Sequence, residues 1–197
     1  MVGKIKILGL DVAEYRTGWC LGLAGTIPTP RIFKARLAGE RTEDAAARLA
    51  CWLRDLFERD RPDLIVMEHF LPQGAQGGRT TDFVREGQVG LQYVVRAVAA
   101  CYGIPIRSPY PVTVRIHFCG VASAAPSRPK GYKRTDKEAA ADRKATKAMV
   151  VKRAQQLGYL PPTVTDDDLA DSAAIFDYAS STFGNAAAAF ALAPGDA

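Results

Sequence analysis

Two short, strongly apolar segments of this chain each carry an acid at their end, and this pattern most constrains the fold. Residues 4–12 read KIKILGLDV, with Asp11 near the end, and residues 63–68 read DLIVME and end at Glu68. Such runs are typical of buried strands. Burying an unpaired carboxylate is expensive, so an acid in this position needs a reason, and a bound metal ion is one.

The order of the other elements predicts an α/β protein. Strand-like runs over 4–12, 17–23 and 31–37 are joined by short Gly- and Pro-bearing breaks, which favours an antiparallel meander. Two further strands are expected at 63–68 and 104–107. Apolar residues at helical spacing predict helices over about 42–61, 81–102, 143–157 and 165–182. We expect a mixed sheet of about five strands, three antiparallel and then parallel, with helices on both faces.

The positive charge of the chain is concentrated in one stretch. The net charge is +5, but residues 123–153 alone hold ten Lys or Arg against three acids. This indicates either a polyanionic partner or a solvated helix face, and composition does not separate the two. The length fits one domain over 1–183, in which 122–142 is a polar, basic and mobile insertion, followed by an Ala-rich tail over 184–197.

The cysteines and the N-terminus point to a reducing compartment. No two of the four cysteines are spaced as C-x-x-C, so we expect buried reduced thiols and no zinc site. No segment is apolar enough for a signal peptide or a membrane span. We therefore expect a cytoplasmic protein.

A second pair of acids completes a candidate metal site. Asp168 and Asp171 lie in DDDLADSAA, three residues apart at the start of a predicted helix, and so face the same way. The ends of parallel strands are where sites form in α/β sheets, so Asp11 and Glu68 can meet this pair. Mg²⁺ prefers oxygen ligands, and two ions ~4 Å apart support phosphodiester hydrolysis.

Each acid taken singly has a simpler interpretation. Asp11 could start a turn, Glu68 could be a surface charge, and Asp171 could face solvent. The acids 166–168 could be first-turn anions, with Thr165 as the N-cap of a T-x-x-D box. Taken together, at the ends of two such apolar strands, the acids favour a metal site.

Five segments in order resemble the RuvC family of Holliday-junction resolvases, of the ribonuclease-H-like superfamily. The segments are LGLDVAEYRTGWCL, DLIVMEHF, VREGQVGLQYVVRAVAACYGIPI, RKATKAMVVKRAQQLG and DDDLADSAAIFDYA. The resemblance covers most of the chain. It departs from the family in the long basic segment 122–142, which resembles that of phage proteins, in Ser172 where Ala is commoner, and in a turn after Asp11 that lacks Gly.

The resemblance implies a metal-dependent endonuclease with a ribonuclease-H-like fold. Carried over by position, the metal ligands and catalytic residues are Asp11, Glu68, Asp168 and Asp171. The implied cofactor is Mg²⁺ or Mn²⁺, with two ions per site. The implied partner is DNA with a four-way junction, cut on two opposed strands by a homodimer. The helix over 81–102 is our candidate for the dimer interface.

Several residues are candidates for DNA contact. The basic ones are Lys130, Lys133, Arg134, Lys137, Arg143, Lys144 and Lys147. They either contact phosphates or merely solvate their segment. Phe70 follows a candidate ligand closely and either wedges between bases or belongs to the core.

Three other functions are compatible with parts of the sequence. A ribonuclease H acting on RNA–DNA hybrids would use the same metal chemistry. The pattern LGLD-x(5)-TG also occurs in actin-like ATPases, but their second Asp-Gly phosphate loop and adenosine motif are not found here. The third is a DNA-binding protein without catalysis, and the complete set of acids argues against it.

Overall fold

The computed structural model describes residues 4–69, 82–129 and 131–184. Its elements, in chain order, are β1 (Lys6–Asp11), β2 (Arg16–Leu23), β3 (Arg31–Lys34), α1 (Thr42–Asp60), β4 (Leu64–Met67), α2 (Asp82–Cys101), β5 (Ile106–Arg107), α3 (Pro111–Cys119), α4 (Asp136–Gln156) and α5 (Asp167–Phe183).

The strands form one five-stranded sheet in the order β3-β2-β1-β4-β5. β1 pairs antiparallel with β2, which pairs antiparallel with β3. β1 also pairs in parallel with β4, and β4 pairs in parallel with β5. The predicted mixed sheet, an antiparallel meander followed by parallel strands, is confirmed.

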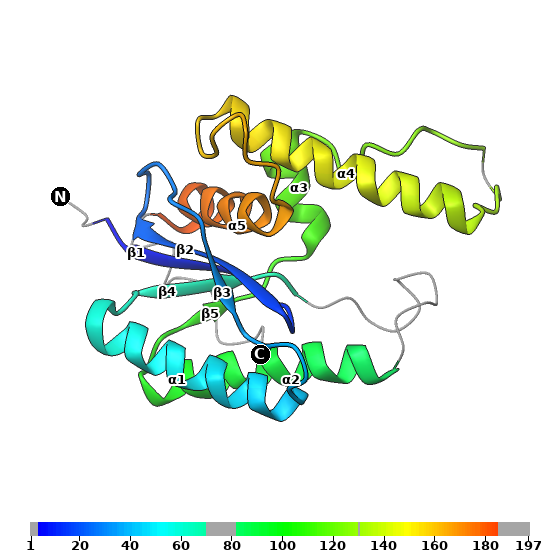
Figure 1. The fold of residues 1–197 in the computed structure, drawn as a ribbon. Coiled ribbons are helices and arrows are strands. Elements are labelled where there is room, and N and C mark those ends of the chain that lie inside the picture. Colours follow the sequence, from blue (N-terminus) through cyan, green and yellow to red (C-terminus); the bar gives the residue numbers. More distant parts are fainter. Residues whose placement is uncertain (1–3, 70–81, 130, 185–197) are drawn as a thin grey trace.

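Helices cover both faces of this sheet, as predicted (Figure 1). Ile7 of β1 and Val66 of β4 belong to a core that they share with α3, α4 and α5. Leu8 and Ile65, their immediate neighbours, belong to a second core with α1 and α2. Successive residues of a strand point to opposite faces, so each strand contributes to both cores.

The same alternation decides where the strand-end acids lie. Asp11 is in phase with Ile7, and Glu68 is in phase with Val66, so both belong to the face that α5 covers. Because β1 and β4 are parallel neighbours, their carboxyl ends lie side by side. The sheet therefore brings both acids to one edge, next to the start of α5.

Glycines in β1 and β2 allow the backbone of α5 to pack directly against the sheet. A Cβ on Gly9 would lie 3.1 Å from the backbone nitrogen of Phe176. A Cβ on Gly18, the residue paired with Asp11, would overlap the carbonyl oxygen of Asp168 and lie 3.2 Å from the Cβ of Ser172. The first turns of α5 are thus seated directly on the β1–β2 hairpin.

Ser172, a departure from the resolvase pattern, is fully buried in this contact. Its hydroxyl donates to the carbonyl oxygen of Leu169 at 2.9 Å, one turn earlier in α5. A buried hydroxyl satisfied within its own helix costs little, so Ser replaces Ala here without a further partner.

Helix α3 is an element that the sequence analysis does not predict. Its start carries Pro111 at a position where a missing N–H costs nothing. Its end is closed by Gly120, which has a φ of 77° and donates to the carbonyl oxygen of Ile116. The Pro and Gly at its ends were available as signals.

One predicted helix start is wrong, and so is one of the helix caps considered. α4 begins at Asp136 and not near residue 143, because Thr135 caps it and forms a capping box with Glu138. Residues 136–142 are therefore helical and not part of a loop. α5 is capped by Asp166 and not by Thr165, since the Asp166 carboxylate accepts from the backbone N–H groups of residues 168 and 169.

The cysteine prediction is correct only in part. Cys20 is buried, but Cys51 and Cys101 are exposed on helices and Cys119 is half-buried; all four are free thiols. Apart from Gly184, which caps α5, the proposed tail lies outside the described residues. Within the described ranges, no helix is both long and apolar enough to cross a bilayer.

The Gly18 contact yields a stability prediction. Gly18→Ala should destabilise the protein by at least about 1–3 kcal/mol, because its Cβ overlaps helix backbone that cannot move alone. Ser181→Ala is the control: it changes an exposed residue near the end of α5 and should change the stability by less than about 0.5 kcal/mol. Urea unfolding of both variants measures the difference. Equal stabilities would contradict the close seating of α5.

Candidate active site

The four predicted acids come from three rigid elements that meet at one edge of the sheet. Asp11 is the last residue of β1, and Asp168 and Asp171 occupy the first turns of α5. Glu68 directly follows β4, where the Gln92 side chain of α2 donates to its carbonyl oxygen at 2.9 Å. The next backbone N–H, at residue 69, donates to the carbonyl oxygen of residue 109. The backbone around Glu68 is therefore held from both sides.

Burial and mutual repulsion raise the pKa values of these acids. Burial raises the pKa of Asp11 well above its usual range, and the charges of Asp171, Glu68 and Asp168 raise it further. Burial also raises the pKa of Glu68 to about 7, with an added effect of Asp171. The pKa of Asp171 rises to about 6, mainly through burial. Each acid thus interacts with others of the set, and the effect of burial exceeds that of the nearby positive charges of Lys147 and Arg115.

This donor set suits a hard divalent cation. The four side chains offer only carboxylate oxygens, which are the ligands that Mg²⁺ and Mn²⁺ prefer. A bound dication would offset the burial and the repulsion that raise the pKa values of Asp11 and Glu68. The donor chemistry of these residues therefore fits the predicted metal.

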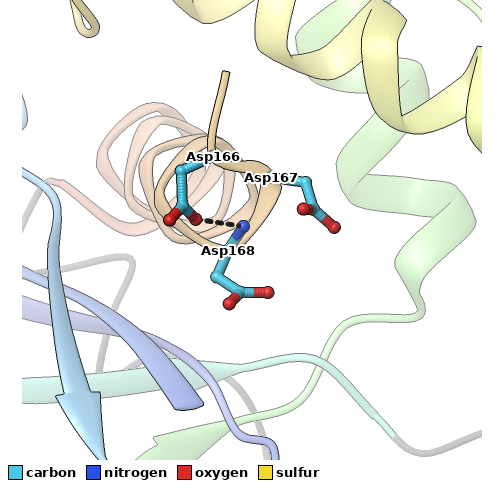
Figure 2. A group of neighbouring side chains, drawn as sticks. All are labelled: Asp166, Asp167 and Asp168. Atoms are coloured by element: carbon cyan, nitrogen blue, oxygen red, sulfur yellow. Dashed lines mark hydrogen bonds between the residues drawn. The ribbon is translucent and has the colours of Figure 1, made fainter. Parts of the chain in front are cut away.

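The tightest cluster of acids differs from the predicted set. Within the described part of the chain, oxygens within 4.8 Å of one another come from Asp166, Asp167 and Asp168, drawn in Figure 2. The Asp166 carboxylate caps α5, as its dashed hydrogen bond to the Asp168 backbone shows, and pairs with Arg16. Asp167 pairs with Lys147. Two of these three acids therefore serve the helix start and its ion pairs, and Asp168 alone is shared with the predicted set.

Three cations lie near the acids: Lys147, which the sequence predicts as a DNA contact, and Arg16 and Arg115, which it does not predict. Lys147 of α4 lowers the pKa of Asp11, and Arg115 of α3 lowers that of Glu68, in both cases against the larger effect of burial. Arg16 of β2 lies 3.1 Å from the Asp168 carboxylate. Arg16 and Arg115 stand alone in apolar or mixed segments, so only the fold reveals their proximity.

The predicted DNA-binding residues fall into three groups. Arg134, Arg143 and Lys147 line a pocket of about 280 Å³ that also contains Asp171. Three further basic residues, on α4 or before it, are exposed and do not line this pocket: Lys133, Lys137 and Lys144. Phe70 and Lys130 lie outside the described residues.

The raised pKa of Glu68 predicts a pH-dependent stability. The folded protein keeps this proton up to about pH 7, whereas the unfolded chain loses it near 4.5. The free energy of unfolding of the metal-free protein should therefore be highest below pH 4.5. It should decrease as the pH rises through the folded-state value of about 7. A shift of this size corresponds to about 3 kcal/mol. Urea unfolding in EDTA at a series of pH values measures it.

Glu68→Gln should make this dependence shallower, because the amide does not titrate, and should leave the contributions of Asp11 and Asp171. Glu43→Gln is the matched control, since Glu43 is exposed in the first turn of α1. It should keep the wild-type slope. Saturating Mg²⁺ should restore the wild type above pH 7. A wild-type curve that stays flat in EDTA would contradict a buried, uncompensated Glu68.

Comparisons with known proteins place the fold. No protein-family model matches the chain, and no curated protein matches it significantly. Among solved structures, Thermus thermophilus RuvC matches with a TM-score of 0.59 at 16% identity, over 89% of this chain and 94% of that one. The structure of T. thermophilus RuvC in complex with Holliday junction substrate gives 0.60 at 14%, over 89% and 94%.

A eukaryotic protein shares the architecture. The yeast mitochondrial Holliday junction resolvase Ydc2 matches with a TM-score of 0.55 at 14% identity, over 90% of this chain and 78% of that one. At these identities the likeness establishes the fold. The chain has the ribonuclease-H-like fold of the RuvC-type Holliday-junction resolvases.

Proposed function

We propose that this protein is a divalent-metal-dependent endonuclease that hydrolyses phosphodiester bonds in branched DNA. One observation carries the proposal: four carboxylates, from β1, the residue after β4 and α5, interact electrostatically with one another, and burial raises the pKa of each. A structure of the same fold contains Holliday junction substrate. That likeness supports a four-way junction as the substrate.

In this proposal Asp11, Glu68, Asp168 and Asp171 hold two ions of Mg²⁺ or Mn²⁺. Such ions, when bound, activate a water and stabilise the leaving oxygen. Lys147 and Arg115, which interact with these acids, supply fixed positive charge for the phosphate that enters the site. The rigid strand ends and the seated α5 keep the carboxylates in place.

We predict that a labelled four-way junction is cut with Mg²⁺ and not in EDTA. Asp11→Asn, Glu68→Gln and Asp171→Asn should each lower cleavage by at least about 100-fold, because each removes a charged ligand. Binding of the junction should change little, since phosphate contacts supply most of the affinity. Gel assays of cleavage and of binding measure the two effects separately.

Asp167→Asn is the matched control for these variants. It removes an acid from the same helix start, but one that pairs with Lys147. It should keep cleavage within a few-fold of the wild type. Wild-type rates in Asp11→Asn would show that the metal site is misplaced. Faster cutting of an RNA–DNA hybrid than of the junction would assign the site to another substrate.

We also propose that the protein is a homodimer with α2 at its interface. Leu91 and Val95 of α2 are fully buried in the chain, whereas Tyr93 between them is 65% exposed. Light scattering at micromolar concentration should give twice the chain mass for the wild type, and Tyr93→Arg should shift it toward the monomer. Leu37→Arg, an exposed apolar position outside α2, is the control. A monomeric wild type, with and without junction DNA, would overturn this proposal.

A further inference from the structure

The N-terminal half of α4 is covered by the chain segment that precedes it, which we call the arm (residues 123–129 and 131–134). The α4 residues that contact the arm lie four apart in the sequence: Glu138, Asp142 and Thr146. Residues four apart share one face of a helix. The arm therefore lies along a polar face of α4, in register with it.

The centre of this row is Asp142, whose side chain is only 9% exposed. Its carboxylate accepts from Arg128 at 2.6 and 3.2 Å and from Arg134 at 3.4 Å. The hydrogen bonds from Arg128 lower the pKa of Asp142, so it is ionised at neutral pH. This carboxylate is therefore paired with two arginines and is not a solvent-exposed surface charge.

The two ends of the arm are fixed as well. The Thr146 hydroxyl lies 3.0 Å from the Ser123 hydroxyl, and accepts from the backbone N–H of residue 124 at 3.2 Å. At the other end, the Tyr132 hydroxyl donates to Glu138 at 2.7 Å, and Arg128 lies over the Tyr132 ring. These contacts hold the described part of the arm against α4.

Anchored in this way, the arm forms one wall of the pocket beside Asp171. Four cations line the pocket, and they come from α3, the arm and α4: Arg115, Arg134, Arg143 and Lys147. Two of its hydroxyls, on Ser123 and Thr146, are already engaged in holding the arm. Two acids, Asp142 and Asp171, also line this open pocket, so its four cations leave it a net positive charge, and it reaches one of the acids of the candidate active site.

We propose that this pocket binds a backbone phosphate of the DNA strand next to the phosphate that is cut, and that Asp142 is the positioning residue that presents Arg134 to it. This inference rests on the proposed function and deepens it. A phosphodiester is the anion that a strand crossing the carboxylates must bring to this place. Arginine binds phosphate through paired N–H donors in a fixed plane, so its placement decides the strength of the contact.

Asp142 distinguishes positioning from general attraction by the sign of its effect. Asp142→Asn removes a negative charge near the pocket, so simple electrostatics predicts tighter DNA binding. If Asp142 instead positions Arg134 and the arm, the same variant binds DNA more weakly. The two explanations therefore predict opposite changes for one substitution.

The test measures binding of a labelled four-way junction in EDTA to full-length variants. Arg134→Ala should weaken binding roughly tenfold, the size of one charge-assisted hydrogen bond. Lys133→Ala is the matched control, because it removes the same charge one residue away but outside the pocket, and should weaken binding by less than about twofold. Asp142→Asn should weaken binding several-fold. Thermal melts establish that each variant is folded.

A second readout identifies the ligand as one phosphate. Replacing single phosphates of the junction by uncharged methylphosphonates should reveal one position beside the cut site that weakens wild-type binding. At that position the replacement should cost Arg134→Ala nothing more. Equal effects of Arg134→Ala and Lys133→Ala, or unchanged or tighter binding by a folded Asp142→Asn, would overturn the inference.

The two proposals fail in different ways. If the wild type does not cut the junction with Mg²⁺ but Arg134→Ala still binds it more weakly than Lys133→Ala, the nuclease proposal fails and the phosphate pocket stands. If the wild type cuts but the two variants bind alike, the pocket fails and the nuclease proposal stands. If Asp142→Asn does not fold, the comparison of Arg134→Ala with Lys133→Ala decides alone.

Discussion

The seating of α5 on the β1–β2 hairpin is the contact on which the candidate site depends. Gly9 and Gly18 remove the side chains that would hold the helix away from the strands. Backbone contact at Gly18 fixes both the height and the rotation of α5 next to Asp11. This contact fixes the position of Asp168 and Asp171, one turn apart on α5, relative to Asp11 and Glu68. Close packing at small residues therefore brings acids from three separate parts of the sequence together.

This packing has an electrostatic cost that gives the site its chemical character. Burial raises the pKa values of Asp11, Glu68 and Asp171, and repulsion from other carboxylates raises them further. Folded proteins keep such groups where a ligand of opposite charge offsets the cost. Lys147, Arg16 and Arg115 stand around the acids without neutralising them. Under the proposed function, this arrangement provides positive charge at the rim for an entering phosphate and negative charge at the centre for a cation.

The acids of the candidate site are easier to identify from the sequence than the cations around them. Asp11 and Glu68 are visible because an acid at the end of an apolar strand is costly, and the α5 pair follows from helical spacing. The early start of α4 was readable from the capping box of Thr135 and Glu138, and was obscured by the basic composition around it. Arg16 and Arg115 were not predictable, because their role arises only from the tertiary fold. Nor was the contact of Asp142 with the arm, which needs a segment to fold back on its own helix.

The central claim is that a divalent cation relieves the repulsion among these buried carboxylates. The most direct test follows the carboxyl carbon of Glu68 by NMR through a pH titration, in EDTA and in saturating Mg²⁺. Without metal, Glu68 should titrate near pH 7. With Mg²⁺ its titration should move below the ordinary glutamate value of 4.5, because the ion stabilises the charged form. A titration near 4.5 in EDTA that Mg²⁺ leaves unchanged would contradict the account.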